Sequence, residues 1–203
     1  MDYTMVVGLL LAAGLSSRMG QEKLLLPFKG HTLLEETLEN LSRAGLNHKV
    51  VVTKAAIAAA LDFPGDVTVI LNPRPEDGQA SSLSLGIKTC RQIPDCEGIL
   101  VFLGDEPLIT PGLIKRVLKA QEDNPQSIIL PEYDGKPGHP VAIGPTWYRA
   151  FAGETGDRGG RQIIAAHPES VIRIPGDAPS LMDVDCEEDY RKVLHYGKKR
   201  NKS

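Results

Sequence analysis

The feature that most constrains the fold is an apolar run near the N-terminus that leads directly into a loop of small residues. Residues 5–11 contain no polar side chain, which is typical of a strand buried on both faces of a sheet. Gly14 and Gly20 follow, with Arg18 between them and Lys23 just beyond. Glycines let the backbone approach a ligand closely, the N–H groups of such a loop point inward, and the cations neutralise negative charge. The stretch therefore predicts a buried strand that ends in a binding loop for a nucleoside triphosphate.

The spacing of this loop excludes two well-known phosphate-binding motifs. Five residues lie between Gly14 and Gly20, one more than in the P-loop, and Gly20 is not followed by Lys and then Ser or Thr. The loop also lacks the Gly-x-Gly-x-x-Gly pattern, which removes the main support for a nicotinamide-dependent dehydrogenase. The plain structural alternative is a strand-to-helix turn that carries two surface cations.

The rest of the chain alternates between strand-like and helical patterns. Apolar runs typical of strands occur at residues 49–53, 67–71, 98–103, 127–130 and 171–174. Helical patterns occur at residues 33–44, 54–61, 81–91, 110–121, 159–166 and 187–195. Thr32 and Glu35 predict a capping box on the first helix, and Gly45 predicts its end. The alternation predicts a Rossmann-like α/β fold, with a mostly parallel central sheet and helices on both faces. Residues 131–147 interrupt it with a turn and a further strand, so we expect a β-hairpin excursion there.

Length and composition narrow the class of protein. The 203 residues suffice for one domain with a full core, expected over residues 1–196 and followed by a basic flexible tail at 197–203. A net charge of -3 gives no general attraction to nucleic acid or to an anionic membrane. No apolar run approaches the ~20 residues of a membrane-spanning helix, and the N-terminus lacks the basic region of a signal peptide. Three cysteines without metal-ligand spacing predict free thiols in a reducing cytoplasm, and five scattered histidines predict no zinc site.

Carboxylates follow the apolar run at residues 98–103 and recur near the C-terminus. Asp105 lies just past a predicted strand, at the edge where open α/β sheets bind ligands. A carboxylate there can hold Mg²⁺ between phosphate groups, although an aspartate in a turn also commonly bonds its own backbone. The N-terminal loop favours the metal interpretation. Asp183 and Asp185 share one face of an extended segment, and Asp185 either gives a second metal contact or caps the next helix with Glu188.

The N-terminal loop as a whole resembles the signature of a nucleotidyltransferase family. It reads Leu11-Ala12-Ala13-Gly14-x-Ser16-x-Arg18-Met19-Gly20-x-x-Lys23, followed by Leu26-Pro27. This pattern is similar to the MobA-like family, which joins a nucleoside monophosphate to molybdopterin. The resemblance implies the nucleotidyltransferase form of the Rossmann-like fold, phosphate contacts from Arg18 and Lys23, and nucleotide contacts along Leu11, Ala12, Ala13 and Gly14. The Ala12-Ala13 pair resembles the cytidylyltransferase branch, because the guanylyltransferase branch usually has Gly there.

Two further segments resemble the family with one departure each. Gly78-Gln79-Ala80-Ser81-Ser82 resembles a segment beside the base and ribose, which implies nucleotide contacts from Gly78, Ser81 and Ser82. The two serines fit helix N-caps equally well, and Gln79 replaces the more common Met.

The second of these segments is Gly104-Asp105-Glu106-Pro107, which resembles the family's Gly-Asp-Gln-Pro or Gly-Asp-Met-Pro and supports Asp105 as the Mg²⁺ ligand. Glu106 is the departure, since it places a second carboxylate beside Asp105. The ending Asp183-x-Asp185-x-x-Glu188-Asp189-Tyr190 is also similar to the family.

Three side chains in the second half of the chain are candidates for binding the acceptor. The Gly-His-Pro segment around His139 resembles one that lines the acceptor side in the cytidylyltransferase branch, while a histidine in a hairpin is more commonly a surface or core imidazole. The segment 156–161 is also family-like and carries Arg158 and Arg161. Guanidinium groups suit a phosphate, and the plain alternative is an ion pair between Asp157 and Arg161.

The resemblance implies an enzyme that joins CMP from CTP, or else GMP from GTP, to the terminal phosphate of molybdopterin or molybdenum cofactor and releases pyrophosphate. The phosphate oxygen is already anionic, so positioning and charge neutralisation by Mg²⁺ on Asp105, and by Arg18 and Lys23, suffice. A molybdoenzyme apoprotein or its chaperone is the expected protein partner. The alternatives are a sugar- or polyol-phosphate nucleotidyltransferase, a non-catalytic cofactor carrier, and a nicotinamide oxidoreductase.

Overall fold

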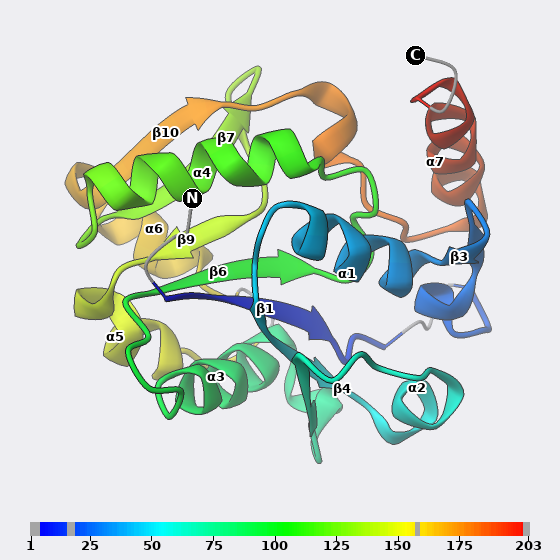
Figure 1. The fold of residues 1–203 in the computed structure, drawn as a ribbon, viewed down its shortest axis with the longest axis horizontal. Helices are drawn as coiled ribbons and strands as arrows, with labels where there is room; N and C mark the ends of the chain where they lie inside the picture. The colour runs from blue at the N-terminus through cyan, green and yellow to red at the C-terminus, as the bar shows by residue number, and fades with distance from the viewer. Residues whose placement is uncertain (1–4, 16–18, 157–158, 201–203) are drawn as a thin grey trace.

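A mostly parallel sheet forms the centre of the computed structural model, which describes residues 5–15, 19–156 and 159–200 (Figure 1). Its strands are β1 (Val6–Ala12), β4 (His48–Thr53), β5 (Val67–Leu71), β6 (Gly98–Leu103), β7 (Ile128–Tyr133), β8 (Lys136–Pro137), β9 (Val141–Ile143) and β10 (Val171–Pro175). The order across the sheet is β10-β7-β9-β6-β1-β4-β5, with β8 attached to β7. Strand β9 runs antiparallel to both of its neighbours, and β8 is antiparallel to β7. The mostly parallel α/β fold is therefore confirmed.

Strand β1 occupies the middle of the sheet, with β4 on one side and β6 on the other, both parallel to it. The chain first builds outward from β1 through β4 to β5, and then returns to place β6 on the opposite side. Leu11 pairs with Leu103 near the ends of β1 and β6, so the two loops that follow these strands emerge side by side. Such a reversal of strand order opens a crevice at the carboxyl edge of the sheet, where open α/β folds bind ligands.

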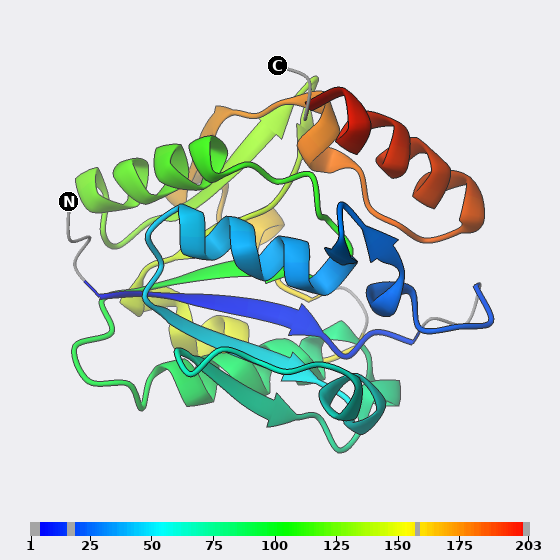
Figure 2. The same ribbon diagram turned by 45° about the vertical axis from the view of Figure 1, so that its right-hand side comes forward.

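Helices cover both faces of the sheet (Figures 1 and 2). Packed with one face are α1 (Leu33–Arg43), α2 (Ala55–Ala60) and α4 (Pro111–Asp123), and packed with the other are α3 (Gln79–Cys90), α5 (Tyr148–Ala152) and α6 (Arg161–Ala166). Alternate side chains of β1 enter the two cores: Leu10 packs with the α1 and α4 side, whereas Leu9 and Leu11 pack with α3. This division follows from the two-residue repeat of a strand.

Local capping fixes where the helices begin. The capping box of α1 is confirmed, since the Glu35 N–H donates to Thr32 Oγ1 at 3.2 Å and the Thr32 N–H donates to Glu35 Oε2 at 2.7 Å. Gly45 follows α1 with a φ of +94°, a left-handed conformation in which glycine has no steric penalty. Thr110 caps α4 by accepting the Leu113 N–H. These contacts between near neighbours in the sequence fix the first turns of α1 and α4, and Gly45 follows the end of α1.

A third apolar cluster attaches the C-terminal part of the chain to the site edge. Two short strands, β2 (Pro27–Phe28) and β3 (His31–Thr32), pair antiparallel after the N-terminal loop. Helix α7 (Glu187–Arg200) packs beside them through Val193, which clusters with Phe28 and Leu108. The Tyr190 hydroxyl also donates to the Pro27 carbonyl at 2.6 Å. This packing brings the segment just before α7 next to the turn that follows β6.

Two boundaries differ from the sequence expectation. The hairpin expected near residues 131–147 is present as β7 and β8, but the strand after it, β9, joins the main sheet between β6 and β7 because its three residues are all buried. Helix α7 continues to Arg200, so part of the expected tail at 197–203 is helical. The division into a single domain over residues 1–196 stays a prediction. Across the described ranges, no helix is long and apolar enough to cross a membrane.

Candidate active site

A cavity of about 570 Å³ lies at the carboxyl edge of the sheet, where the loops after β1 and β6 meet. The strand ends contribute backbone and small side chains, and the loop before α3 closes the opposite wall. The lining residues are Leu11, Ala12, Ala13, Gly14, Leu15, Lys23, Leu24, Pro75, Glu76, Gly78, Gln79, Ser82, Leu103, Gly104, Asp105 and Asp185. The structure thus gathers Leu11 to Gly14, Lys23, Gly78, Ser82, Asp105 and Asp185 into one place, as expected from the sequence. Arg18 lies outside the described residues.

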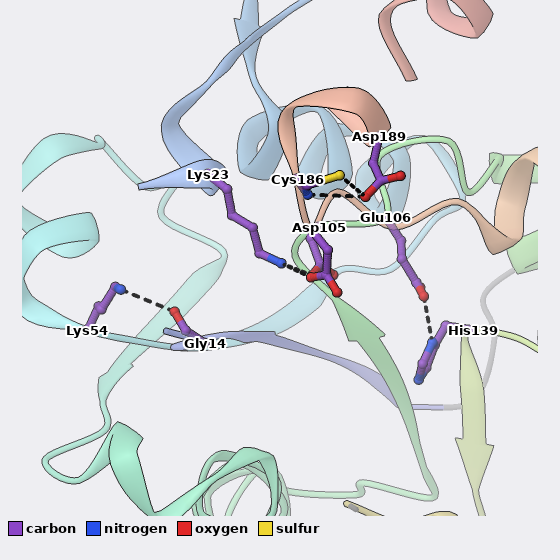
Figure 3. A network of polar contacts seen from close by, with 9 residues as sticks. Gly14, Lys23, Lys54, Asp105, Glu106, His139, Cys186 and Asp189 are labelled. Atoms are coloured by element: carbon purple, nitrogen blue, oxygen red, sulfur yellow. Dashed lines mark hydrogen bonds and ion pairs between the residues drawn. The ribbon is translucent and has the colours of Figure 1, made fainter. Parts of the chain in front are cut away.

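Lys23 bridges two carboxylates in this cavity. Its ammonium donates to Asp105 Oδ2 at 2.6 Å (Figure 3). The same ammonium donates to Asp185 Oδ1 at 2.9 Å. Burial acts to lower the pKa of Lys23, but the charge and hydrogen bonds of Asp105 and Asp185 outweigh it and raise the pKa. The lysine therefore carries its full positive charge here, and three segments far apart in the chain meet at one nitrogen atom.

The residues around Lys23 fit a divalent cation. Asp105 and Asp185 already bind one positive charge between them, and carboxylate oxygens are ligands that Mg²⁺ prefers. Asp183 lies close to the same two carboxylates: burial, and then the charges of Asp105 and Asp185, raise its pKa and so disfavour its ionised form. Among the described residues, no three acidic, His or Cys side chains are gathered closely enough to hold a metal as they stand. The Lys23 ammonium contacts both Asp105 and Asp185, so a divalent cation would have to displace it to bind between these two carboxylates.

Lys54 anchors the start of the N-terminal loop, a role that the sequence reasoning missed. The residue follows β4, the neighbour of β1, and its ammonium donates to the Gly14 carbonyl at 3.2 Å and pairs with Glu22 at 2.8 Å. The Thr53 hydroxyl donates to the Ala12 carbonyl at 3.1 Å. The sequence feature that could have indicated this role is the position of Thr53 and Lys54 at the end of β4, the strand next to β1. Together they hold the loop against the sheet edge on both sides of Ala13.

The two serines of the Gly78–Ser82 segment have different surroundings. Ser82 lines the large cavity, whereas Ser81 does not and donates instead to the Gly78 carbonyl at 2.8 Å. Buried Asn72 donates to both hydroxyl oxygens at 2.9 Å and so fixes their positions. The expectation that the serines cap α3 is wrong, because the helix already begins at Gln79 with Gly78 in the N-cap position. The φ of +87° at Gly78 allows this earlier start.

A smaller cavity, of about 50 Å³, adjoins the first one and shares Leu11, Gln79 and Leu103 with it. Most of its walls are apolar, and its polar groups include His139 and Arg161. The remaining lining residues are Leu83, Val101, Val141, Ile143, Phe151, Gly159, Gly160 and Ile164. The structure therefore brings His139 and Arg161 together next to the large cavity. Arg158 and Asp157 lie outside the described residues.

Glu106 points away from the carboxylates that surround Lys23 and contacts His139. Its Oε1 lies 3.0 Å from His139 Nδ1, as Figure 3 shows. Burial raises the pKa of Glu106, and although burial acts to lower the pKa of His139, the charge and hydrogen bond of Glu106 raise it. Sequence reasoning placed Glu106 beside Asp105 as a further acid but gave no sign of this partner, which lies 33 positions further along the chain.

The start of α7 corrects the expected capping role of Asp185. The cap lies one residue later: the Cys186 backbone N–H and its thiol both contact Asp189 Oδ2, at 3.1 and 3.0 Å. Asp189, three positions after Cys186, takes the role expected of Glu188. Asp185 is therefore not needed to cap the helix, and its side chain reaches Lys23 instead.

Residues 8–171 match the sequence model of the MobA-like NTP transferase domain, a range that includes most of the sheet and all the lining residues of the two cavities except Asp185. The chain belongs to the MobA-like NTP transferase family. It is therefore a nucleotidyltransferase, as the N-terminal loop and Asp105 indicate.

Three curated proteins are similar to this chain over nearly its whole length. Purine catabolism protein PucB of Bacillus subtilis is 26% identical over 199 residues, covering 93% of this chain and 95% of its own. The molybdenum cofactor cytidylyltransferase of Escherichia coli is 25% identical over 182 residues, covering 88% and 90%. Nicotine blue oxidoreductase of Paenarthrobacter nicotinovorans is 29% identical over 211 residues, covering 95% and 98%.

Solved structures share the fold of this chain. The crystal structure of Rv0371c from Mycobacterium tuberculosis is 28% identical, covers 95% of this chain and 99% of its own, and superimposes with a TM-score of 0.84. A second structure of that protein is a complex with manganese, with a TM-score of 0.76 over the same shares of the two chains. A nucleotidyl transferase from Methanothermobacter, 21% identical over 97% of this chain and 99% of its own with a TM-score of 0.79, shows the same fold.

Proposed function

We propose that the chain transfers CMP from CTP to the terminal phosphate of molybdopterin or molybdenum cofactor, with release of pyrophosphate. The observation that carries this proposal is the pair of adjoining cavities, with Asp105, Asp185 and Lys23 in the larger and His139 and Arg161 in the smaller. A nucleotidyl transfer needs two substrates side by side at one cluster of charges. The similarity to a molybdenum cofactor cytidylyltransferase supports the choice of acceptor.

The larger cavity is assigned to the nucleotide. Ala12 and Ala13 are 1% and 2% exposed on its wall and leave room for a base beside the end of β1. The glycines of the loop let its backbone approach the phosphates closely. The hydrogen bond from Lys54 to the Gly14 carbonyl holds the start of the loop in place, and Lys23 supplies a positive charge. Gly78 and Ser82 close the far side, and Arg18 is expected to join Lys23 on the phosphates.

In the transfer, an oxygen of the acceptor phosphate attacks the α-phosphorus of CTP. A new P–O bond forms, the bond from the α-phosphorus to the bridging oxygen breaks, and pyrophosphate leaves with that electron pair. No proton has to be removed from the acceptor oxygen, so the chain needs no strong base. Asp105 and Asp185 would hold Mg²⁺, which would supply charge neutralisation on the phosphates when bound. Lys23, released from the two carboxylates, neutralises the charge that develops on the leaving group.

The direct test is pyrophosphate release from purified protein with CTP, Mg²⁺ and molybdopterin or molybdenum cofactor. We expect turnover with CTP and much slower turnover with GTP, UTP or ATP. A thermal-shift panel of the four nucleotides with Mg²⁺ gives an independent readout, because a ligand of the native state raises apparent stability. Tight cofactor binding without pyrophosphate release would favour the carrier alternative, and turnover with a sugar or polyol phosphate alone would favour the other nucleotidyltransferase alternative.

A second candidate function rests on the match to nicotine blue oxidoreductase along nearly its full length. A reducing activity toward a planar dye-like acceptor would appear as NADH or NADPH oxidation without pyrophosphate release. We expect no such activity, because the loop after β1 lacks the Gly-x-Gly-x-x-Gly pattern. Dye-dependent NADH oxidation by the purified protein would overturn the cytidylyltransferase proposal.

Location and protein partners remain proposals. The thiols of Cys90, Cys96 and Cys186 are all free, which suits the reducing cytoplasm that we propose as the location. Delivery of the product to a molybdenum hydroxylase apoprotein or its chaperone would follow from the proposed reaction. Co-purification of such a partner with the tagged protein from cells that make molybdenum hydroxylases is the check.

A further inference from the structure

Glu106 and His139 form a buried polar pair directly behind the smaller cavity. The Glu106 side chain is 8% exposed, and its Oε1 receives one contact, from His139 Nδ1 at 3.0 Å. Its other oxygen, Oε2, has no hydrogen-bond partner in the described part of the chain. A buried carboxylate with one unpartnered oxygen lowers stability, because the lost hydration of that oxygen is not replaced by a hydrogen bond. Because packing alone would favour an apolar residue here, the carboxylate needs a different explanation.

The pair is arranged so that one edge of the imidazole faces outward. Glu106 contacts the Nδ1 edge, and the other ring nitrogen lies on the edge turned away from Glu106 (Figure 3). His139 is a lining residue of the smaller cavity, whereas Glu106 lines neither cavity. Glu106 thus acts on the cavity through the histidine only.

We propose that Glu106 is a positioning residue, which holds the His139 ring through Nδ1 so that Nε2 faces the smaller cavity beside Arg161 and contacts the phosphate of the acceptor. This inference rests on the proposed function, in which the smaller cavity receives the acceptor. A carboxylate that accepts from Nδ1 fixes both the ring orientation and the nitrogen that carries the proton. The raised pKa of His139 agrees with this role, since Glu106 favours the protonated ring.

Neighbouring groups restrict what Nε2 can contact. Asp105 and Glu106 lie on the β6 side, Arg161 lies on the α6 side, and the rest of the smaller cavity is mostly apolar. A protonated imidazole next to a guanidinium favours an anionic group, and phosphate oxygens accept from both. The acceptor class is therefore a compound with a phosphate monoester next to an apolar or planar body.

The first experiment compares Glu106→Gln with Glu106→Met in steady-state assays with CTP, Mg²⁺ and molybdopterin. Gln keeps an oxygen that accepts from Nδ1, so we expect an acceptor KM within about threefold of the wild type, while Met removes that oxygen and raises the acceptor KM about tenfold. The CTP KM should change less than about twofold in both variants. An unchanged acceptor KM in Glu106→Met, or equal rises in the acceptor and CTP KM values, would overturn the positioning role.

Glu36 provides a matched control. It is a buried carboxylate, 3% exposed, held by one partner, Lys29, at 3.0 Å, and it lines neither cavity. Glu36→Met should lower the melting temperature to a similar extent as Glu106→Met and leave both KM values unchanged. A rise in the acceptor KM for Glu36→Met as well would show that destabilisation alone explains the effect, and the proposal would fail.

A spectroscopic measurement separates this inference from the proposed function, because it needs no substrate. In ¹⁵N-labelled protein, we expect the His139 Nδ1 signal of a protonated, hydrogen-bonded nitrogen, assigned by its loss in His139→Gln. That signal should persist in Glu106→Gln and shift in Glu106→Met. A wild-type Nδ1 without a proton would overturn the inference whatever the substrate is. Normal NMR behaviour with no turnover on molybdopterin would instead refute the proposed acceptor and leave the Glu106–His139 arrangement standing.

Discussion

The larger cavity is walled mostly by strand ends and loop backbone, whereas the smaller one is walled by side chains from β6, β9, α3, α5 and α6. One part of the first cavity comes from residues 11–15, the end of β1 and the loop after it, and the rest comes from residues 23–24, 75–82, 103–105 and 185. The second has no such continuous part, because apart from Leu11 it is assembled from short segments between residues 79 and 164. A local pattern of glycines and small residues can therefore encode the part of the first cavity that follows β1. The second depends on which side chains happen to meet after folding, so its specificity can change while the fold and the nucleotide site are kept.

The largest expected effect comes from Asp105→Asn, a near-isosteric change in the wall of the larger cavity that should disable catalysis and leave the smaller cavity unchanged. Loss of the carboxylate removes the main cation ligand, and we expect kcat to fall by roughly a thousandfold. The circular dichroism spectrum and melting temperature should stay close to the wild type. Asp123→Asn removes an exposed ion pair with Lys119 on α4 and serves as the control with normal activity. Near-full activity of Asp105→Asn at saturating Mg²⁺ would contradict the metal role.

Lys23→Met separates two proposed roles of the lysine in the larger cavity. One is to neutralise charge on the phosphates, and the other is to occupy the space between Asp105 and Asp185 when no cation is bound. We expect kcat to drop about a hundredfold, because the positive charge of the Lys23 ammonium next to the phosphates is lost. Without nucleotide, the same variant should bind Mn²⁺ about tenfold more tightly, since the ammonium no longer competes for Asp105 and Asp185. Electron paramagnetic resonance titration of free Mn²⁺ measures this directly. Weaker Mn²⁺ binding than in the wild type would mean that Lys23 does not occupy the cation position.

Arg161→Ala tests whether the smaller cavity acts separately from the larger one. Loss of the guanidinium should raise the acceptor KM about tenfold and leave the CTP KM nearly unchanged. Arg191→Ala, which removes an exposed pair with Glu187 on α7, is the matched control. If Arg161→Ala raised the CTP KM by the same factor, the two cavities would not be assigned to different substrates.

The smallest expected effect comes from replacing both Ala12 and Ala13 with Gly. Removing two methyl groups from the cavity wall should move the ratio of kcat/KM for CTP over GTP by roughly threefold to tenfold toward GTP. A competition assay with both nucleotides present measures the ratio in one reaction. An unchanged ratio would show that these positions do not contact the base.

How much of the structure the sequence predicts depends on whether the cause is local. The Thr32 and Glu35 capping box, the apolar strands and the Gly45 helix end all follow from neighbouring residues, and all are confirmed. The start of α3 was misplaced because Gly78, with a left-handed backbone, replaces the serine caps that composition suggested. Pattern reasoning also put the α7 cap one residue early, since a cysteine is a rare partner in that role.

The place of Asp105 in the candidate site could be predicted, because it closely follows β6 at the centre of the sheet, beside the end of β1. Lys23 lies eleven residues after the end of β1, and it was identified from the motif of the N-terminal loop. The contact between Glu106 and His139 could not be predicted in this way. It depends on β9 entering the sheet antiparallel beside β6, a choice of pairing that no local pattern specifies.

The wall shared by the two cavities has a consequence for how such a protein diversifies. Leu11, Gln79 and Leu103 face both spaces, so a substitution at any of them alters the fit of two ligands at once. Val141, Phe151 and Ile164 face only the smaller space and can vary without disturbing the larger one. New acceptor preferences should therefore arise by exchanges on α5, α6 and β9, while the residues between the two spaces are held fixed by having to serve both.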